Sequence, residues 1–350
     1  MRTGGAASID ASRGIATLLV LLHHAIAAEP VLSASTFAAV NDALGLVRMP
    51  LFMIVTGCLL GARPPGGGGE RLYRLRKAIV RLVWPMIMVA LTGVLLLRGQ
   101  GVDWPIASAL LLGSWHLWYL QALIWLKLAY ASLDTVWRPS ADQLIALSLA
   151  ASLVAQIDVA TGMVLFSLGR AVELLPFLLF GAWVGRKPSV LDARALPYLL
   201  YAVALSALVV RFAGHGAAPP LARTSWMAML AGAGSGLWLL RHAPRFAALE
   251  LVGRYAFPIF LWHLPWFAAA DLLLLGPCHI AGALAVAIRV AVGLLLPALV
   301  VRGVLASGVV PIVLIGDAAP RRAPQKLPQT PAAGYRSALR RFAPGMNHPC

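Results

Sequence analysis

Residues 12–25 read SRGIATLLVLLHHA, an apolar run that begins next to an arginine and ends next to two histidines. The composition of the whole chain indicates the class of protein to which this run belongs. Hydrophobic residues make up 60% of the chain and charged residues 12%, whereas soluble domains are roughly 45–50% apolar. The sequence therefore predicts an integral membrane protein, in which residues 12–25 belong to the first span.

A membrane-spanning helix needs about 20 mostly apolar residues. On that criterion the chain is predicted to be an all-α, polytopic membrane protein with about ten transmembrane helices. We expect these helices at 11–29, 43–62, 78–97, 115–134, 141–158, 168–185, 194–212, 223–240, 251–273 and 281–301.

The charges of the connecting segments predict the orientation. The segment 63–81 holds six bases, whereas 29–43 holds two acids and no base. Because cytoplasmic loops carry the excess of Lys and Arg, both termini are predicted to be cytoplasmic. Arg211 and Arg223 then fall at the outer ends of their spans, where we expect them to snorkel or to line a cavity.

Residues 1–315 are predicted to form a single membrane domain. Residues 316–350 hold six bases and one acid and are expected to be a Pro-rich, disordered cytoplasmic tail. The net charge of +16 does not indicate nucleic-acid binding, because the Lys and Arg residues of the chain lie in short clusters between apolar runs. The three cysteines are scattered and predict neither a disulfide framework nor a metal site. The N-terminus shows no cleavable signal pattern.

Arg13 and His24 are eleven positions apart, which in an α-helix is about 20° beyond three full turns and about 16 Å along the axis. They therefore share a face, whereas His23 is rotated by about 100°. Ionisable residues inside a membrane indicate a site or a watery pathway, so His24 is the stronger candidate, although hydrogen bonds to neighbouring helices would also explain both histidines. Asp10 is expected to cap the helix or to pair with Arg13.

Five segments resemble, in order, the membrane proteins of acyltransferase family 3. The first is IDASRGIATLLVLLHHA, in which Arg13 and His24 have the spacing of the family signature and His23 does not. Similar to further family segments are RMPLFMIVTGCLLG at 48–61, RLYRLRKAIVRLVWP at 71–85, SWHLWYLQAL at 114–123 and GRYAFPIFLWHLPWF at 253–267.

The resemblance implies a stand-alone membrane O-acyltransferase of the bacterial cytoplasmic (inner) membrane. Such proteins move an acyl group, commonly acetyl, from cytoplasmic acyl-CoA to hydroxyls of cell-envelope carbohydrates such as exopolysaccharide or O-antigen. The expected co-substrate is acetyl-CoA or another short acyl-CoA, without a metal. The expected partners are this donor, a carbohydrate or lipid-linked glycan acceptor and membrane lipids, and the oligomeric state is not indicated.

Acyl transfer to a hydroxyl needs a base and a group that stabilises the developing oxyanion. We expect His24 to be the base and Arg13 to hold an anionic part of the donor or to organise the entrance below His24. Arg suits the phosphates of CoA, and the resemblance points to Arg71 and Arg74, with Arg81 next. The acceptor side is expected to use His116, Trp118, Tyr119, Glu173 and His263.

Each assignment has a structural alternative. Arg13 would also serve as a boundary anchor, and the bases of the 63–81 segment would simply hold that loop inside. His116, Trp118 and Tyr119 fit an interfacial aromatic belt, Glu173 an ion pair with Arg170, and His263 a helix-to-helix hydrogen bond. The alternative function is a non-enzymatic transporter or flippase for a glycan or small metabolite, disfavoured because acidic residues are scarce inside the spans.

Overall fold

A computed structural model describes nearly all of the predicted membrane domain. The described residues are 4–34, 36–63, 68–99, 105–113, 116–157, 165–192, 195–214, 224–244 and 246–306. The predicted tail at 316–350 and Arg223 lie outside them. Within the described residues the structure is helical, without strands.

The helices follow the apolar runs of the sequence. They are α1 (Gly4–Ala27), α2 (Pro30–Ser33), α3 (Thr36–Gly61), α4 (Gly68–Gly99), α5 (Ile106–Leu112), α6 (Leu117–Val136), α7 (Ala141–Gln156), α8 (Leu168–Arg186), α9 (Ala195–Ala213), α10 (Trp226–His242), α11 (Ala247–Arg254), α12 (Ala256–Ala270) and α13 (Gly282–Ala306). Short helical turns occur at Leu165–Ser167, Pro188–Asp192 and Asp271–Leu275. The all-α prediction is therefore confirmed.

By helix length and composition, the described part of the structure has fewer candidate membrane spans than the ten predicted. In the described residues six helices are long and apolar enough to cross a membrane, or up to seven if the bent pair α5 and α6 is one span. Each of the ten predicted segments does contain a helix, but Ala141–Gln156 and Tyr198–Ala213 are shorter apolar helices. A helix of 16 residues spans about 24 Å, less than the roughly 30 Å of a hydrocarbon core, so the count of ten is not confirmed.

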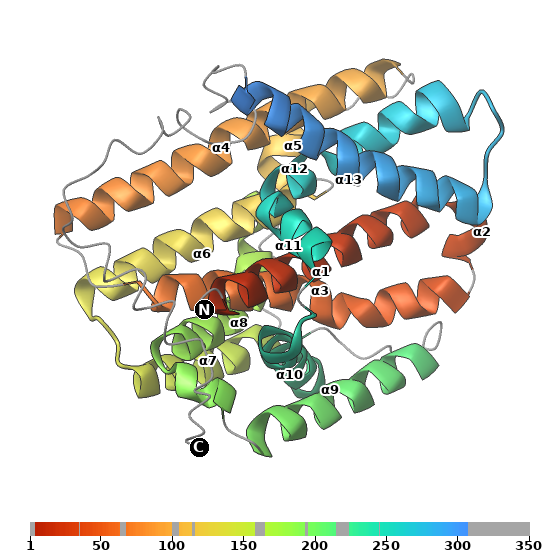
Figure 1. Cartoon of the computed structure of the whole chain (residues 1–350). Helices are drawn as coiled ribbons and strands as arrows, with labels where there is room; N and C mark the ends of the chain where they lie inside the picture. The colour runs from red at the N-terminus through yellow and green to blue at the C-terminus, as the bar shows by residue number, and fades with distance from the viewer. Residues whose placement is uncertain are drawn as a thin grey trace, which may run out of the picture.

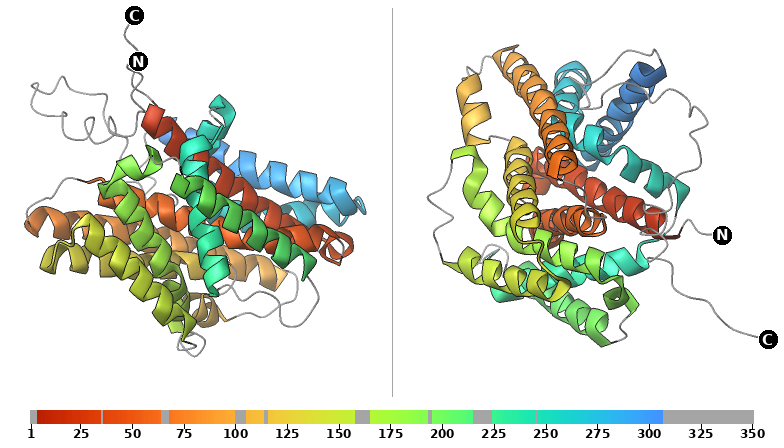
Figure 2. Two further views of the ribbon diagram at one scale, coloured as in Figure 1. Left: turned by 90° about the horizontal axis from the view of Figure 1, so that it is seen from below. Right: turned by 90° about the vertical axis from the view of Figure 1, so that its left-hand side faces the viewer.

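In Figure 1 the long helices α1, α3, α4 and α13 run side by side from left to right, with α4 and α13 above and α1 and α3 in the middle, while α9 lies below them and α10, also below, is seen nearly end-on. The views in Figure 2 show the same bundle from below and from its left-hand end. α1 lies at the centre and packs against α3, α11, α12 and α13. Its histidines are therefore enclosed by protein rather than left on the outer surface of the bundle.

Glycines bring α3 and α8 into close contact. Gly57 and Gly61 of α3 face the backbone of α8, and a Cβ on either would lie under 3.0 Å from main-chain atoms there. Gly181 and Gly185 of α8 face the backbone of α3 in the same way. Small residues four apart let membrane helices approach closely, and this reciprocal arrangement fixes one wall of the bundle.

Ion pairs explain the charged residues that interrupt the apolar helices. Arg211, at the end of α9, donates two hydrogen bonds to the Asp42 carboxylate of α3, the longer of them 2.8 Å. It is 8% exposed, so it is neutralised inside the bundle rather than snorkelling. Arg211 and Asp42 therefore lie at the same level, as the predicted order of the loops requires.

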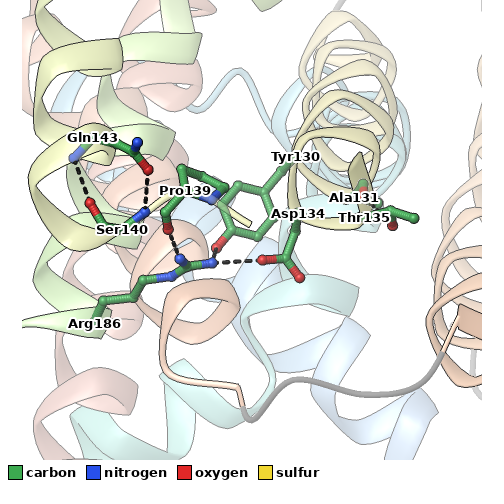
Figure 3. Close-up of polar contacts among 8 residues, drawn as sticks. All are labelled: Tyr130, Ala131, Asp134, Thr135, Pro139, Ser140, Gln143 and Arg186. Carbon is green, nitrogen blue, oxygen red and sulfur yellow. Dashed lines mark hydrogen bonds and ion pairs between the residues drawn. The ribbon is translucent and has the colours of Figure 1, made fainter. Parts of the chain in front are cut away.

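A second network closes the opposite end of the bundle (Figure 3). Arg186, the last residue of α8, pairs with Asp134 near the end of α6 at 2.6 Å and donates to the carbonyl oxygen of Pro139. Ser140 and Gln143 form a capping box at the start of α7. Because these contacts meet at one guanidinium, they tie α6, α7 and α8 together.

Candidate functional site

A cavity of about 500 Å³ lies between α1, α3, α8 and the start of α6. Four of the residues predicted for the acceptor side line it, together with His24. The ionisable and hydroxyl-bearing side chains around it belong to His23, His24, Arg48, His116, Tyr119, Ser167, Arg170 and Glu173. The sequence-predicted residues His24, His116, Trp118, Tyr119 and Glu173 therefore meet in one place.

His24 and His23 both line the cavity, although they point in different directions from α1. Their ring centroids are 4.7 Å apart. The His23 Nδ1 atom lies 3.1 Å from the Asn41 Oδ1 atom of α3, so His23 is anchored on one neighbouring helix. The two positions are rotated by about 100° on α1, but both rings line the cavity, so the cavity wall does not distinguish His24 from His23 as the prediction did.

Arg13 does not belong to the cavity wall. It pairs with Asp10 at 3.7 Å, which confirms the predicted pairing. It also acts electrostatically on Tyr119, which does line the cavity, and on Lys127. The cavity wall therefore contains His24 but not Arg13, although the two were predicted to act together.

The aromatic side of the cavity is organised by α6 and α8. Arg170 pairs with Glu173 at 2.8 Å, which confirms the predicted ion pair, and its guanidinium carbon lies 5.7 Å from the centroid of the Trp118 ring. The carboxylate and the aromatic face both border the cavity. Together they offer a hydrogen-bonding group beside a flat apolar surface, as a sugar ring requires.

The turn before α6 is held by hydrogen bonds from Gln121. Its Nε2 atom donates to the Leu110 carbonyl at 2.6 Å, and its Oε1 atom accepts from the Ser167 hydroxyl at 2.7 Å. Gly113 adopts a φ of 61° here, and a Cβ at that position would crowd Ser167 and Gln121. This packing fixes His116 and Trp118 on the cavity wall.

His263 lies behind the cavity wall rather than in it. It is fully buried, with its ring centroid 5.1 Å from that of His24 and 4.9 Å from that of His116. Its Nδ1 atom lies 2.7 Å from the Phe260 carbonyl oxygen of its own helix. The hydrogen bond between helices comes from His116 instead, whose Nε2 atom lies 2.9 Å from the Leu261 carbonyl oxygen.

Arg48 is a cavity residue that the sequence analysis did not single out. It is 5% exposed and donates from Nη1 to the carbonyl oxygen of Asn41 at 2.9 Å and to its Oδ1 atom at 2.7 Å. It also acts electrostatically on His24. An available signal was its place directly before MPLF, inside a predicted span, where a base is costly unless it has a role.

A group of bases lies near Arg13. Lys127 of α6 is within electrostatic range of Arg13, Arg63 and Arg81. Lys127 was not predicted and would have been found by asking why a lysine lies inside a span. The side chains of Arg71 and Arg74 lie outside the described part of the structure, and only their place in α4 is seen.

The described residues contain no group of three or more His, Cys, Asp or Glu side chains arranged to hold a metal ion. The ionisable groups at the cavity can instead take up a proton, through an imidazole, or bind an anion, through a guanidinium. Those two properties are what acyl transfer to a hydroxyl needs.

Comparison with known proteins gives the family of the chain. The family model described as "Acyltransferase domain", that of acyltransferase family 3, matches residues 6–314. No curated protein and no solved structure matched the chain. The match covers the whole helical bundle and the cavity within it, and with its long apolar helices the chain therefore belongs to acyltransferase family 3 and is a transferase of the membrane type.

Proposed function

We propose that the protein is an O-acyltransferase of the bacterial inner membrane. It takes an acyl group, acetyl in the simplest case, from cytoplasmic acyl-CoA and transfers it to a hydroxyl of a cell-envelope carbohydrate. His24 is the general base. The observation that carries the proposal is that His24 lines a cavity of about 500 Å³ together with Trp118, Tyr119 and Glu173.

The cavity suits a sugar acceptor by its size and by its chemistry. Ligand pockets are typically about 300–1,000 Å³, and one monosaccharide with part of its neighbour fits within that range. Trp118 offers an aromatic face, and Glu173 an acceptor for sugar hydroxyls. Since both come from helices tied by Gln121 and Ser167, the acceptor would be held against a rigid wall.

The bases near Arg13 suit the donor. The CoA moiety carries several phosphates, for which Arg and Lys are the usual protein partners. Lys127 is within electrostatic reach of Arg63, Arg81 and Arg13. Tyr119 lines the cavity and lies within electrostatic range of Arg13. A thioester held by the bases would therefore reach toward His24 past Tyr119.

In the proposed step His24 removes the proton from the acceptor hydroxyl while the oxygen attacks the acyl carbon. The carbon–sulfur bond breaks, and the proton ends on the sulfur of CoA. The guanidinium of Arg48, which acts electrostatically on His24, would stabilise the developing oxyanion. A positioned base of this kind contributes about 10²–10⁴-fold to the rate.

The test is acyl transfer by purified protein in lipid vesicles, supplied with labelled acetyl-CoA and cell-envelope polysaccharide. We expect label in ester linkage on the carbohydrate and a loss of about 10²–10⁴-fold in His24→Ala. His242→Ala is the matched control, because His242 of α10 binds its own helix at Trp238 and is absent from the cavity wall. Full transfer by His24→Ala, or acyl-CoA left unconsumed by the native protein, would contradict the proposal.

A further inference from the structure

Three imidazoles of the cavity wall and the His263 imidazole behind it form a row from three parts of the chain. The ring centroids are 4.7 Å apart for His23 and His24, 5.1 Å for His24 and His263, and 4.9 Å for His263 and His116. Two imidazoles joined by one N–H···N bond of about 2.9 Å have ring centres roughly 5 Å apart. The spacing of this row therefore suits the passage of a proton from ring to ring.

Hydrogen bonds to main-chain carbonyls fix the tautomers of the two innermost rings. The His263 Nδ1 atom lies 2.7 Å from the Phe260 carbonyl oxygen, and the His116 Nε2 atom 2.9 Å from that of Leu261. A carbonyl oxygen only accepts, so each of these nitrogens carries the hydrogen of the neutral ring. The other nitrogen of each ring then carries a lone pair and no hydrogen.

Those two lone pairs are the unusual feature. In the part of the chain that the structure describes, His116 Nδ1 and His263 Nε2 are the buried side-chain polar atoms without a hydrogen-bond partner. The two side chains are 1% and 0% exposed. A buried acceptor without a donor is costly, and two adjacent ones beside His24 point to a proton that occupies this place during function.

The surroundings isolate these rings from other titratable groups. His263 is flanked by Phe260 and Phe267, and α13 presents Gly293, where a Cβ would crowd both Phe267 and His263. The ionisable groups that act on the cluster are His23 from α1 and Arg48 from α3. Because burial disfavours a charged imidazole, a proton on His263 needs a second acceptor, and the His116 Nδ1 lone pair is available beside it.

We propose that His263 and His116 form a relay with His24, which holds the reaction's proton between the acceptor hydroxyl and the leaving sulfur. The inference rests on the proposed function. His24 takes the proton as the carbon–oxygen bond forms, and the proton passes to His263 Nε2 and is shared with His116 Nδ1. It returns through His24 to the CoA sulfur as the carbon–sulfur bond breaks, so that hydroxyl and thioester become ester and thiol. His263 acts through His24 and is a positioning residue for its proton.

Two substitutions at one position separate this role from a structural one. The amide nitrogen of His263→Asn keeps the donor to Phe260 but removes the Nε2 lone pair. His263→Gln places an amide oxygen near Nε2, which accepts a hydrogen bond but cannot carry a proton at neutral pH. The relay predicts that both lower kcat at least about tenfold, with KM for acyl-CoA within about twofold of the native value. A normal rate in His263→Gln would overturn it, because a hydrogen-bond acceptor alone would then suffice.

The second readout is the solvent isotope effect in single turnovers. Because several protons move in the same step, a plot of the native rate against the deuterium fraction of the solvent should be curved. The same plot should be linear for His263→Asn. An unchanged curve in that variant would overturn the relay. His116→Gln, which keeps a donor for Leu261 and loses the Nδ1 lone pair, gives the same test if His263 variants fail to elute as folded protein.

The outcomes also separate the two proposals. If the native protein consumes no acyl-CoA, the proposed function fails and the relay with it. If the native protein is active and His24→Ala is not, while both His263 variants and His116→Gln keep native rates, the function stands and the relay alone is wrong.

Discussion

The Arg289 guanidinium of α13 binds the Glu29 carboxylate at 3.1 Å and the Asp271 carboxylate at 2.8 Å. Glu29 follows the end of α1 and Asp271 follows α12, so one side chain joins the two helices that carry His24 and His263. Arg289 and Glu29 are both buried, at 7% and 3% exposure. The triad thus fixes the spacing of the two imidazoles from the ends of their helices.

Replacing Arg289 with Ala should destabilise the protein by about 3–5 kcal/mol, because it leaves a buried carboxylate without its cation. Thermal unfolding in detergent measures the loss. The double variant Glu29→Gln with Arg289→Met removes both charges and should recover part of the stability. Arg302→Ala on the exposed side of the same helix is the control, expected within about 0.5 kcal/mol. Equal unfolding temperatures for Arg289→Ala and Arg302→Ala would contradict the role of the triad.

Adding one methyl group between α3 and α8 should also be costly. In Gly181→Ala the new Cβ would overlap the carbonyl group of Ile54, and overpacking of this kind costs about 1–3 kcal/mol. Gly69→Ala is the matched control, since a Cβ there meets nothing within 4 Å. The same unfolding measurement decides: a Gly181 variant as stable as the Gly69 variant would mean that the two backbones are not in contact.

Asn41 should affect acceptor binding without lying in the cavity wall. Its Oδ1 atom accepts from Arg48 at 2.7 Å and lies 3.1 Å from His23 Nδ1. Removing it in Asn41→Ala loses a hydrogen bond to a charged group, about 1.5–3 kcal/mol, so kcat/KM for the acceptor should fall about tenfold or more. Asn41→Asp keeps the accepting oxygen and should retain more activity. Steady-state kinetics with Asn41→Ala indistinguishable from the native protein would disprove this positioning.

Lys127 should lower the KM for an acyl donor that carries nucleotide phosphates and should not affect the KM for a donor that lacks them. In Lys127→Met we expect KM for acetyl-CoA to rise about tenfold, the value of one charge-assisted contact. KM for acetyl-pantetheine, which lacks the nucleotide phosphates, should stay the same. Lys77→Met removes an exposed base of α4 and serves as the control for net charge. An equal rise in KM for both donors would contradict this role and would show that Lys127 acts on folding or on the thioester end of the donor.

Much of the bundle could be predicted because apolar runs of about 20 residues have few uses other than membrane helices. The positions of all ten runs match helices, but the number that crosses does not follow from hydropathy. Ala141–Gln156 is too short to span alone, and its Ser148 hydroxyl instead binds the Pro176 carbonyl oxygen of α8 at 2.8 Å. Such a helix is placed by its neighbours, which a local pattern does not contain.

The candidate site was predictable where one helix carries the information. The three-residue spacings on one helix give the ion pairs of Arg170 with Glu173 and of Arg13 with Asp10, whereas the period of α1, which puts Arg13 and His24 on one face, does not bring Arg13 to the cavity. Contacts between distant segments were not predictable: nothing local links His24 to His263, or Arg211 to Asp42. The place of Arg289 inside an apolar run indicates a role but not its partners, because the carboxylates that bind it belong to Glu29 and Asp271, far away in the sequence.

The glycine contacts between α3 and α8 bear on how substrates come and go. Gly57 and Gly181 leave no side-chain layer between those two helices. We therefore expect α3 and α8 to behave as one rigid unit, which keeps Arg48 and Glu173 at a constant separation. On the other side of the cavity, Gly113 has a φ of 61°, and Gln121 joins α6 to Leu110 of α5 and to Ser167. A disulfide crosslink between α3 and α8 should therefore leave turnover unchanged, because it adds no constraint to two helices whose backbones are already in contact.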